Sequence, residues 1–456
     1  MDHPQDTAAN GGMTVFERRA RRLDTSPAVL LVTAGILLQF MSGYSAEYFF
    51  PVPLDRPLVL AGLALAVYQA FTSGQRWWRP TLIHYVMLTF LGWVLISMAW
   101  SGSITSSVAL FSWLDSVGLI PFAIYLLAPL VYSTPERRRV LLGGLTLLGG
   151  YLGVIALMEG LNLYQWVWPQ YIYNPESPHF GRAGGPARQV ASNGLQLMGC
   201  GLAAAAFAMD SRRRRESVPA LIIAALCLFG TFFTMTRSIW IGVAAGLVAA
   251  LILDRRTRKL LGWGSVGLVS ALLLALLLQP DLRDELNSRL SDSRSAFDRL
   301  NANSAAFRVL LARPLEGVGF NQFANSHADW LWQSPTFPVT STGIAVHNVP
   351  LGYAAELGLP GAALWLGCLM LAALHLLRSP SRDVDSYILR RIAIAYAVCW
   401  LVVGMLVPMT YALPATLLWL FLALPTDRSW LGFGHPGGAV NRKHPEASDT
   451  MSNGSV

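Results

Sequence analysis

The chain has 456 residues, of which 54% are hydrophobic and 13% are charged, and its formal net charge is +8. Soluble globular domains carry about 25% charged residues, so this composition excludes an ordinary soluble protein and indicates a protein that spans a membrane. The positive charge predicts no nucleic-acid partner, because lysines and arginines in short loops set the orientation of membrane helices.

Apolar runs recur along the whole chain. A hydrocarbon layer about 30 Å thick is crossed by about 20 apolar residues in a helix, and roughly twelve runs approach this length. In chain order, the runs are 28–48, 58–73, 81–100, 108–131, 140–160, 190–209, 218–236, 238–254, 260–279, 349–377, 391–409 and 411–425. We therefore predict an all-α, polytopic membrane protein in contact with membrane lipids. The two short runs, 238–254 and 411–425, are expected to be tilted, kinked or buried in protein.

Polar segments between the apolar runs predict the domain organisation. The predicted parts are an N-terminal tail at 1–27, transmembrane helices 1–9 within 28–279 with an outer loop at 161–189, a large outer loop at 280–346, transmembrane helices 10–12 within 347–425 and a C-terminal tail at 426–456. In the first loop, the aromatic stretch from Trp166 to Tyr173 is typical of a membrane interface. In the second, apolar residues between Leu282 and Leu300 recur mostly every three or four residues, which predicts an amphipathic helix.

The basic residues predict how these helices are oriented. If the N-terminus is cytoplasmic and each run crosses the membrane once, most of the 34 lysines and arginines lie on the cytoplasmic side, as the positive-inside rule requires. Both termini are then cytoplasmic. The arginines that fall on the outer side are Arg56, Arg182, Arg188, Arg237, Arg283, Arg289, Arg294, Arg299, Arg308 and Arg313. Because basic residues oppose export across the membrane, we expect some of these exceptions to have a function.

Two of the outer motifs contain arginine beside a helix end. In TMTRSIWIG (234–242), Arg237 stands between two apolar runs. It either reaches toward lipid headgroups or binds phosphate, because a guanidinium matches phosphate oxygens and stays charged. In FRVLLARPLEGVGFNQF (307–323), Arg308 and Arg313 precede a turn rich in proline and glycine, which is also the pattern of an ordinary surface helix that ends there.

The third motif, HNVPLGYAAELGLPG (347–361), opens an apolar run. Asn348 is suited to cap the helix, and His347 then lies at the positive end of the helix dipole, which favours a neutral ring able to accept a proton. An ordinary hydrogen-bonded interfacial histidine is the alternative. Glu356 inside the run requires a partner, and we expect Arg308 or Arg313, which the carboxylate would orient. Pro360 is expected to bend the helix near Glu356.

Together, these three motifs resemble those of the O-antigen ligase family of membrane glycosyltransferases, which also includes O-antigen polymerases. The resemblance implies a C-type glycosyltransferase fold in the bacterial inner membrane, with the active site on the periplasmic side. It implies transfer of a glycan from undecaprenyl diphosphate to a sugar hydroxyl, of the lipid A core in a ligase or of another glycan in a polymerase. It also implies that no metal, nucleotide sugar or other cofactor takes part.

The resemblance assigns roles to individual residues. His347 would act catalytically at the acceptor hydroxyl, and Arg237 would bind the donor diphosphate together with Arg182 or Arg188 from the preceding outer loop. The supporting residues would be Arg308, Arg313, Asn348 and Glu356.

The sequence also has three other interpretations. The motifs do not distinguish a ligase from a polymerase. A multi-span transporter or flippase is disfavoured, because carboxylates such as Asp115 and Glu356 are rare within the predicted spans. The pair Asp383 and Asp385 could hold a metal and a nucleotide sugar, but it lies on the predicted cytoplasmic side, and we interpret it as a solvated loop.

Overall fold

The structure, a computed structural model, describes residues 26–41, 53–72, 79–177, 179–211, 214–253, 283, 294–332, 345–380 and 384–432. The predicted run at 260–279 lies outside these residues. So do most of the two predicted tails and the greater part of the segment between Leu282 and Arg294.

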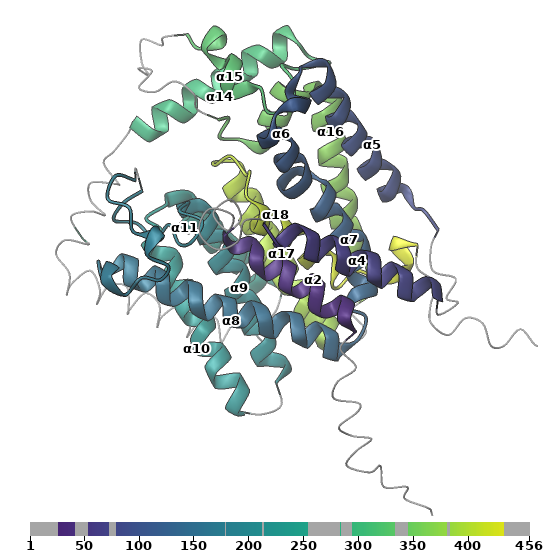
Figure 1. Ribbon diagram of the computed structural model, residues 1–456, viewed down its shortest axis with the longest axis vertical. Coiled ribbons are helices and arrows are strands. Elements are labelled where there is room, and N and C mark those ends of the chain that lie inside the picture. The colour runs from purple at the N-terminus through teal and green to yellow at the C-terminus, as the bar shows by residue number, and fades with distance from the viewer. Residues whose placement is uncertain are drawn as a thin grey trace, which may run out of the picture.

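The described residues form helices joined by turns and loops, and no strand occurs among them (Figure 1). The longer helices are α2 (Pro27–Leu38), α4 (Asp55–Thr72), α5 (Leu82–Trp100), α7 (Leu119–Val131), α8 (Pro135–Gly160), α9 (Val190–Asp210), α10 (Arg214–Phe233), α11 (Arg237–Leu253), α14 (Arg294–Ala312), α16 (Val349–Arg378), α17 (Val384–Gly404) and α18 (Ala412–Ala423). The short α-helices are α6 (Ser107–Ser112) and α15 (Phe323–Ser326). A π-helical stretch, Trp113–Val117, joins α6 to α7. The prediction of an all-α protein is confirmed.

Within the described part of the chain, seven helical stretches are long and apolar enough to cross a membrane. They are α5, the stretch Ser107–Val131, α8, α9, α10, α16 and α17. The helices α2, α11 and α18 are apolar but shorter. Every predicted run except 260–279 overlaps a described helix. All residues of α18 are buried, which confirms the expectation that the short run at 411–425 is buried in protein. These helices define a polytopic membrane protein.

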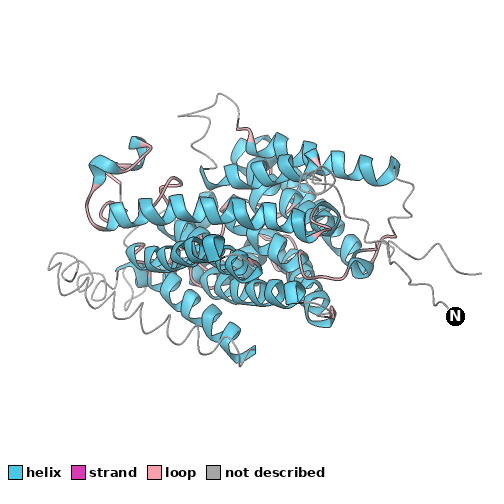
Figure 2. Ribbon diagram, turned by 90° about the horizontal axis from the view of Figure 1, so that it is seen from below, coloured by secondary structure: helices cyan, strands magenta, loops and turns pink. Residues whose placement is uncertain are grey.

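One bundle contains most of these helices, with α18 near its centre. α18 packs against α7, α9, α16 and α17, while α8, α9 and α10 pack on one another, α11 packs on α17, α2 on α4 and α5 on α16. The view from below shows the helices lying side by side (Figure 2). α14 and α15 lie at one end of the bundle (Figure 1), and α14 packs against α16.

α14 lies against the bundle through small side chains. Ala302, Ala305 and Val309 are buried on it, and their small size lets the helix approach α16 closely. Phe297 and Leu300 of the predicted amphipathic helix fall on α14, whereas most of that predicted helix lies outside the described residues. α14 therefore forms part of a layer above the N-terminal end of α16.

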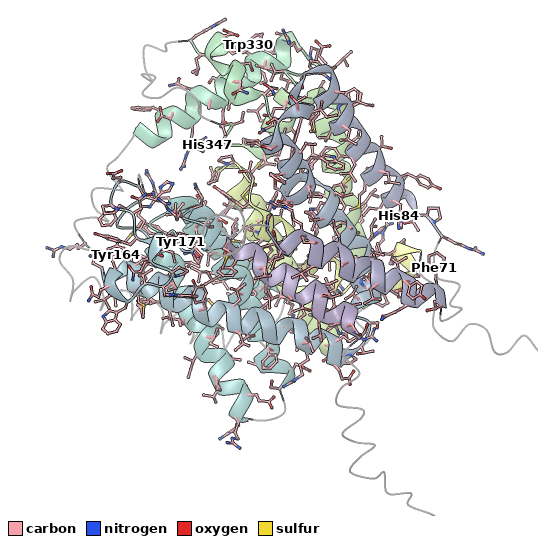
Figure 3. The ribbon with its side chains drawn as sticks, viewed as in Figure 1. Phe71, His84, Tyr164, Tyr171, Trp330 and His347 are labelled. Atoms are coloured by element: carbon pink, nitrogen blue, oxygen red, sulfur yellow. The ribbon has the colours of Figure 1, made fainter. Side chains whose placement is uncertain are left out.

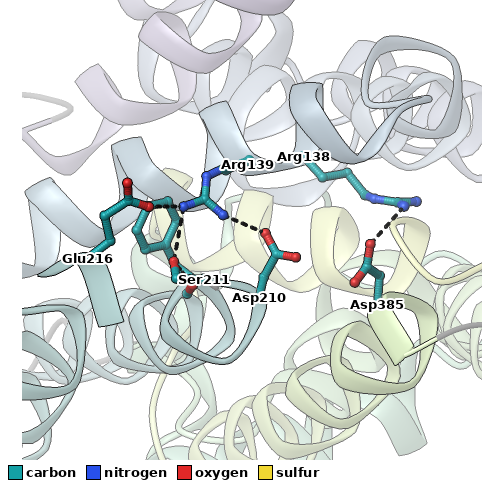
Figure 4. Close-up of polar contacts among 7 residues, drawn as sticks. Arg138, Arg139, Asp210, Ser211, Glu216 and Asp385 are labelled. Atoms are coloured by element: carbon teal, nitrogen blue, oxygen red, sulfur yellow. Dashed lines mark hydrogen bonds and ion pairs between the residues drawn. The ribbon is translucent and has the colours of Figure 1, made fainter. Parts of the chain in front are cut away.

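A polar cluster joins several helices near the N-terminal end of α8 (Figure 4). Arg139 of α8 donates to Asp210 of α9 with an Nη1–Oδ2 distance of 2.9 Å, and it also pairs with Glu216 of α10. Arg138 forms an ion pair with Asp385 of α17 at 3.8 Å. The interpretation of this segment as a solvated loop is therefore wrong for Asp385, which lies in the first turn of a helix.

α16 is bent at Gly358, which has φ 70° and ψ −178°. This confirms the predicted bend near Glu356, two residues before Pro360, which cannot donate to the helix. The turn after α14 satisfies backbone groups around the bend: Val318 N–H donates to the Ala355 carbonyl, Gly319 N–H to the Glu356 carbonyl and Leu359 N–H to the Pro314 carbonyl. The bend therefore joins the second and third sequence motifs directly.

We expect Gly358→Ala to lower the thermal stability of the protein. A Cβ atom at this position would overlap the Leu315 carbonyl, and the backbone conformation is one that L side chains rarely adopt. Such a conformation costs a non-glycine residue about 1–3 kcal/mol. The matched control is Gly367→Ala on the same helix, where the nearest atom to the added Cβ is Val86 Cγ1 at 3.6 Å. Thermal unfolding in detergent measures both variants, and equal midpoints would contradict the role of Gly358.

Candidate active site

Glu356 binds the turn that follows α14 through its side chain as well as its backbone. Its Oε2 accepts a hydrogen bond from the Asn321 N–H at 3.0 Å, and its Oε1 accepts one from the Phe323 N–H at 3.3 Å. A carboxylate can accept bonds at both oxygens, so two backbone donors satisfy this half-buried group. Glu356 thus fixes the shape of the segment that leads from α14 into α15.

Among the described residues, Glu356 pairs with neither Arg308 nor Arg313, so the predicted ion pair is wrong. Arg308 Nε donates to the Trp330 carbonyl at 2.9 Å, and its guanidinium lies 4.6 Å from the centre of the Trp332 ring. Arg313 is exposed at the end of α14. The carboxylate is instead bound by amide N–H groups, which supply the stabilisation that an arginine was expected to give.

Asn348 caps α16 as predicted. Its Oδ1 accepts the Leu351 N–H at 3.0 Å, and its backbone is extended as an N-cap residue requires. The cap fixes where the helix begins, and it therefore also fixes the position of the preceding residue, His347.

We expect Glu356→Gln to destabilise the protein by about 1–3 kcal/mol, the usual cost of leaving a buried donor unsatisfied. The amide replaces one acceptor oxygen with an NH2 group, which would face a backbone N–H. Asp210→Asn is the control, because its partly exposed ion pair with Arg139 should contribute less than about 1 kcal/mol. Denaturation of both variants in detergent gives the comparison, and a larger loss for the control would refute this role of Glu356.

Arg182 lies against the turn that precedes Arg237. Its Nε donates to the Thr234 carbonyl at 3.1 Å, and its Nη2 donates to the Met235 carbonyl at 3.3 Å and to Thr236 Oγ1 at 2.6 Å. This turn joins α10 to α11, and Arg237 is the first residue of α11. The structure therefore brings the predicted residues of the first outer loop and of the TMTRS motif together.

Arg188 lies in the same loop as Arg182, just ahead of α9. Both arginines line a small cavity together with Glu159, Tyr164 and Phe180. Arg188 has a φ of 50° and closes a turn by donating its backbone N–H to the Gly185 carbonyl. Both arginines thus remain candidates for the second phosphate ligand.

His347 lies on the segment that leads into α16, between α14 and the rest of the bundle (Figure 3). Its Nδ1 is 2.8 Å from the Ala345 carbonyl oxygen. Burial and the positive charge of Arg299 lower the pKa of His347 below its ordinary value of 6.5, and weaker effects of Ala345 and Asp298 oppose them. The ring is therefore neutral near pH 7.

Arg299 of α14 interacts electrostatically with both His347 and Arg237. Burial and the positive charge of Arg237 lower the pKa of Arg299, just as Arg299 lowers the pKa of His347. Each pair is therefore close enough for its charges to interact, although the three residues come from different elements. Arg299 was not among the predicted site residues. Its only sequence signal is its place among the arginines on the outer side.

The fold and this site define a class of protein. It is an all-α, polytopic membrane protein that gathers arginines and a neutral histidine beneath a helical layer at one end of its bundle. Arg237, which is exposed, is the first residue of α11. The arrangement suits an anionic ligand beside a group that accepts a proton.

Comparison with known protein families gives one match. A family model described as O-Antigen ligase matches residues 222–366, and this match supports the family that the motifs predicted. The match includes Arg237, Arg299, His347 and Glu356, whereas Arg182 and Arg188 precede it. No curated protein matches the chain. The family indicates a bacterial membrane protein of the glycosyltransferase type, with a glycan and a lipid-linked compound as its general substrates.

Proposed function

We propose that the protein is an inverting O-antigen ligase. It transfers a glycan from undecaprenyl diphosphate to a hydroxyl of the lipid A core, on the periplasmic side of the bacterial inner membrane, with both termini in the cytoplasm. The observation that carries the proposal is the match of residues 222–366, which include Arg237, Arg299 and His347, to the O-Antigen ligase family model. The charge of Arg237 acts on Arg299 and that of Arg299 acts on His347, although these residues come from α11, α14 and the segment leading into α16.

His347 serves as the general base. The Ala345 carbonyl can only accept a hydrogen bond, so His347 Nδ1 carries the proton of the neutral ring and donates it. The lone pair is then on Nε2, which can take the proton of an acceptor hydroxyl. A neutral histidine suits this step, because a hydroxyl is a weak nucleophile until a base removes its proton.

The arginines bind the donor diphosphate. Burial and the positive charge of Arg237 lower the pKa of Arg299, and an anion placed between the two cations relieves their repulsion. A diphosphate carries the matching negative charge, and a guanidinium binds its oxygens with directed hydrogen bonds. Arg237 and Arg299 are accordingly the principal ligands, and Arg182 or Arg188 reaches the diphosphate from the neighbouring loop.

The reaction proceeds by displacement at the anomeric carbon. The acceptor oxygen attacks on the face opposite the phosphate, its bond to carbon forms, and the bond between that carbon and the phosphate oxygen breaks. The electron pair leaves with undecaprenyl diphosphate, and the hydroxyl proton moves to His347 Nε2. Arginines held in place beforehand stabilise the charge that develops on the leaving group, and attack from the opposite face inverts the anomeric configuration.

Purified protein tests this function directly. With a lipid-diphosphate glycan and lipid A core as substrates and a chelator present, we expect the glycan to appear on the core. Activity under chelation supports a reaction that needs no divalent metal, whereas activity restored only by added metal refutes that part of the proposal. A protein that neither modifies the core nor extends the glycan refutes the transferase function.

A polymerase of the same family is the second candidate, because the match covers this type as well. It would join glycan repeats while they remain attached to the lipid. A strain that lacks the gene separates the two: loss of glycan from the lipid A core indicates a ligase, and core carrying single repeats indicates a polymerase.

A further inference from the structure

Glu159 is a buried carboxylate in the last turn of α8, with 4% of its surface exposed. Its Oε1 accepts the Gly184 N–H at 3.2 Å, and its Oε2 accepts the Gly185 N–H at 3.0 Å. Two successive backbone N–H groups form a concave site that suits an anion. Here the anion is a side chain of the protein itself, so Glu159 acts as a clamp on the loop between Arg182 and Arg188.

The clamped segment is closely packed on its other side. Gly185 has a φ of 60°, and a Cβ atom there would lie 2.5 Å from Asn193 Oδ1. Asn193 Nδ2 donates to the Ala183 carbonyl at 3.0 Å. Glu159 and Asn193 therefore hold the segment 183–185 between α8 and α9, and glycine is required where the backbone passes between them.

The same loop is attached to the turn that begins α11. The Ala183 N–H donates to the Phe233 carbonyl at 2.8 Å, and the Arg182 side chain donates to three groups of residues 234–236. A continuous path of hydrogen bonds thus runs from Glu159 through the loop to the residue before Arg237. A change at Glu159 would be transmitted to both arginine-bearing segments.

We propose that Glu159 is a positioning residue for donor binding, which holds the loop 182–188 so that its arginines and Arg237 face one diphosphate. This inference rests on the proposed function, because it assigns the diphosphate to these arginines. Glu159 does not touch the substrate. It differs from Glu356, whose two backbone donors belong to the segment beside α15, and the two carboxylates therefore control different sides of the site.

The mobility of the loop 182–188 provides a test that does not depend on activity. All four native cysteines are buried, so a thiol introduced by Ala187→Cys can carry a spin label between Gly185 and Arg188. We expect the label to be more mobile when Glu159→Gln is added, because the new amide NH2 would face a backbone N–H. Glu356→Gln is the matched control and should leave the label unchanged. Equal mobility with and without Glu159→Gln overturns the proposal.

The second test measures the KM values of the unlabelled protein for the donor and for the acceptor, with the concentration of each varied separately. Glu159→Gln should raise the KM for the lipid-diphosphate glycan about tenfold, which corresponds to about 1.4 kcal/mol, and should leave the KM for the acceptor unchanged. An equal rise in both KM values overturns the proposal, because it indicates a general structural role. If Glu159→Gln does not fold, Glu159→Asp replaces it, because it keeps the charge but shortens the clamp.

The two tests separate the positioning role from the proposed function. If the native protein transfers no glycan, the proposed function fails, and the mobility of the label still decides whether Glu159 holds the loop. If the native protein is active and the label responds but the donor KM does not, the loop does not position the donor and the inference fails.

Discussion

His347→Ala is expected to lower the rate of glycan transfer by about 10²–10⁴-fold, the usual contribution of a general base. The substitution removes the Nε2 lone pair that would take the proton of the acceptor hydroxyl. It leaves the donor arginines in place, so the affinity for the lipid-diphosphate donor should change little. Steady-state rates with purified protein, together with donor binding measured separately, check both parts of this expectation.

The pH dependence of the reaction follows from the same residue. The base must be neutral, so activity falls as the pH drops through the pKa of His347. Burial and Arg299 lower this pKa, which places the acid limb of the acceptor kcat/KM profile below pH 6.5. In Arg299→Ala the limb should move to higher pH, because the charge that opposes protonation is lost. A profile without an acid limb, or a limb that Arg299→Ala does not move, contradicts this account.

His375→Gln is the control for His347→Ala. His375 lies near the C-terminal end of α16, the helix that follows His347, where its Nδ1 is 3.2 Å from the Tyr125 hydroxyl and its ring stacks on Trp430. Its loss should reduce stability without removing transfer. If His347→Ala inserts and folds normally but keeps full activity, His347 is not the base.

The helices could be predicted from the sequence because the length of an apolar run is a local property. The cap at Asn348 and the bend before Pro360 were also predictable, since each depends on residues next to one another in the chain. The partner of Glu356 could not be predicted in this way. Backbone N–H groups have no sequence signature, and only the fold shows that the turn after α14 brings two of them to this carboxylate.

The site residues illustrate the same limit. Arg237 and His347 could be selected from their motifs, but their proximity depends on how α11, α14 and α16 pack. Arg299 belongs to none of the three sequence motifs. Only its charge interactions with Arg237 and His347 in the folded protein mark it as a site residue. Glu159 ends an apolar run and was not singled out, because the glycines that it binds lie in a separate loop. Assignment of a catalytic or ligand role to each of these residues stays a prediction.

Arg237→Ala is expected to lower the donor kcat/KM by about 10²–10³-fold, the range observed when one preorganised donor to a developing anion is removed. Arg299→Ala should have an effect of similar size. Arg237→Lys keeps the charge but not the planar fork of donors, so it should restore only part of the activity. Arg139→Ala provides the control, because Arg139 belongs to the polar cluster near the other end of α8 (Figure 4). It should affect stability without changing the donor KM.

The double variant of Arg237 and Arg299 decides whether they bind one diphosphate. Residues that share a ligand show coupling, whereas independent and distant sites have effects that add as free energies. If both arginines hold the same leaving group, removal of the first already weakens its binding, and removal of the second costs less than it does in the native protein. The fold-loss of the double variant should therefore be smaller than the product of the single losses. A loss equal to that product would mean that the two arginines act separately, and the single diphosphate site would be wrong.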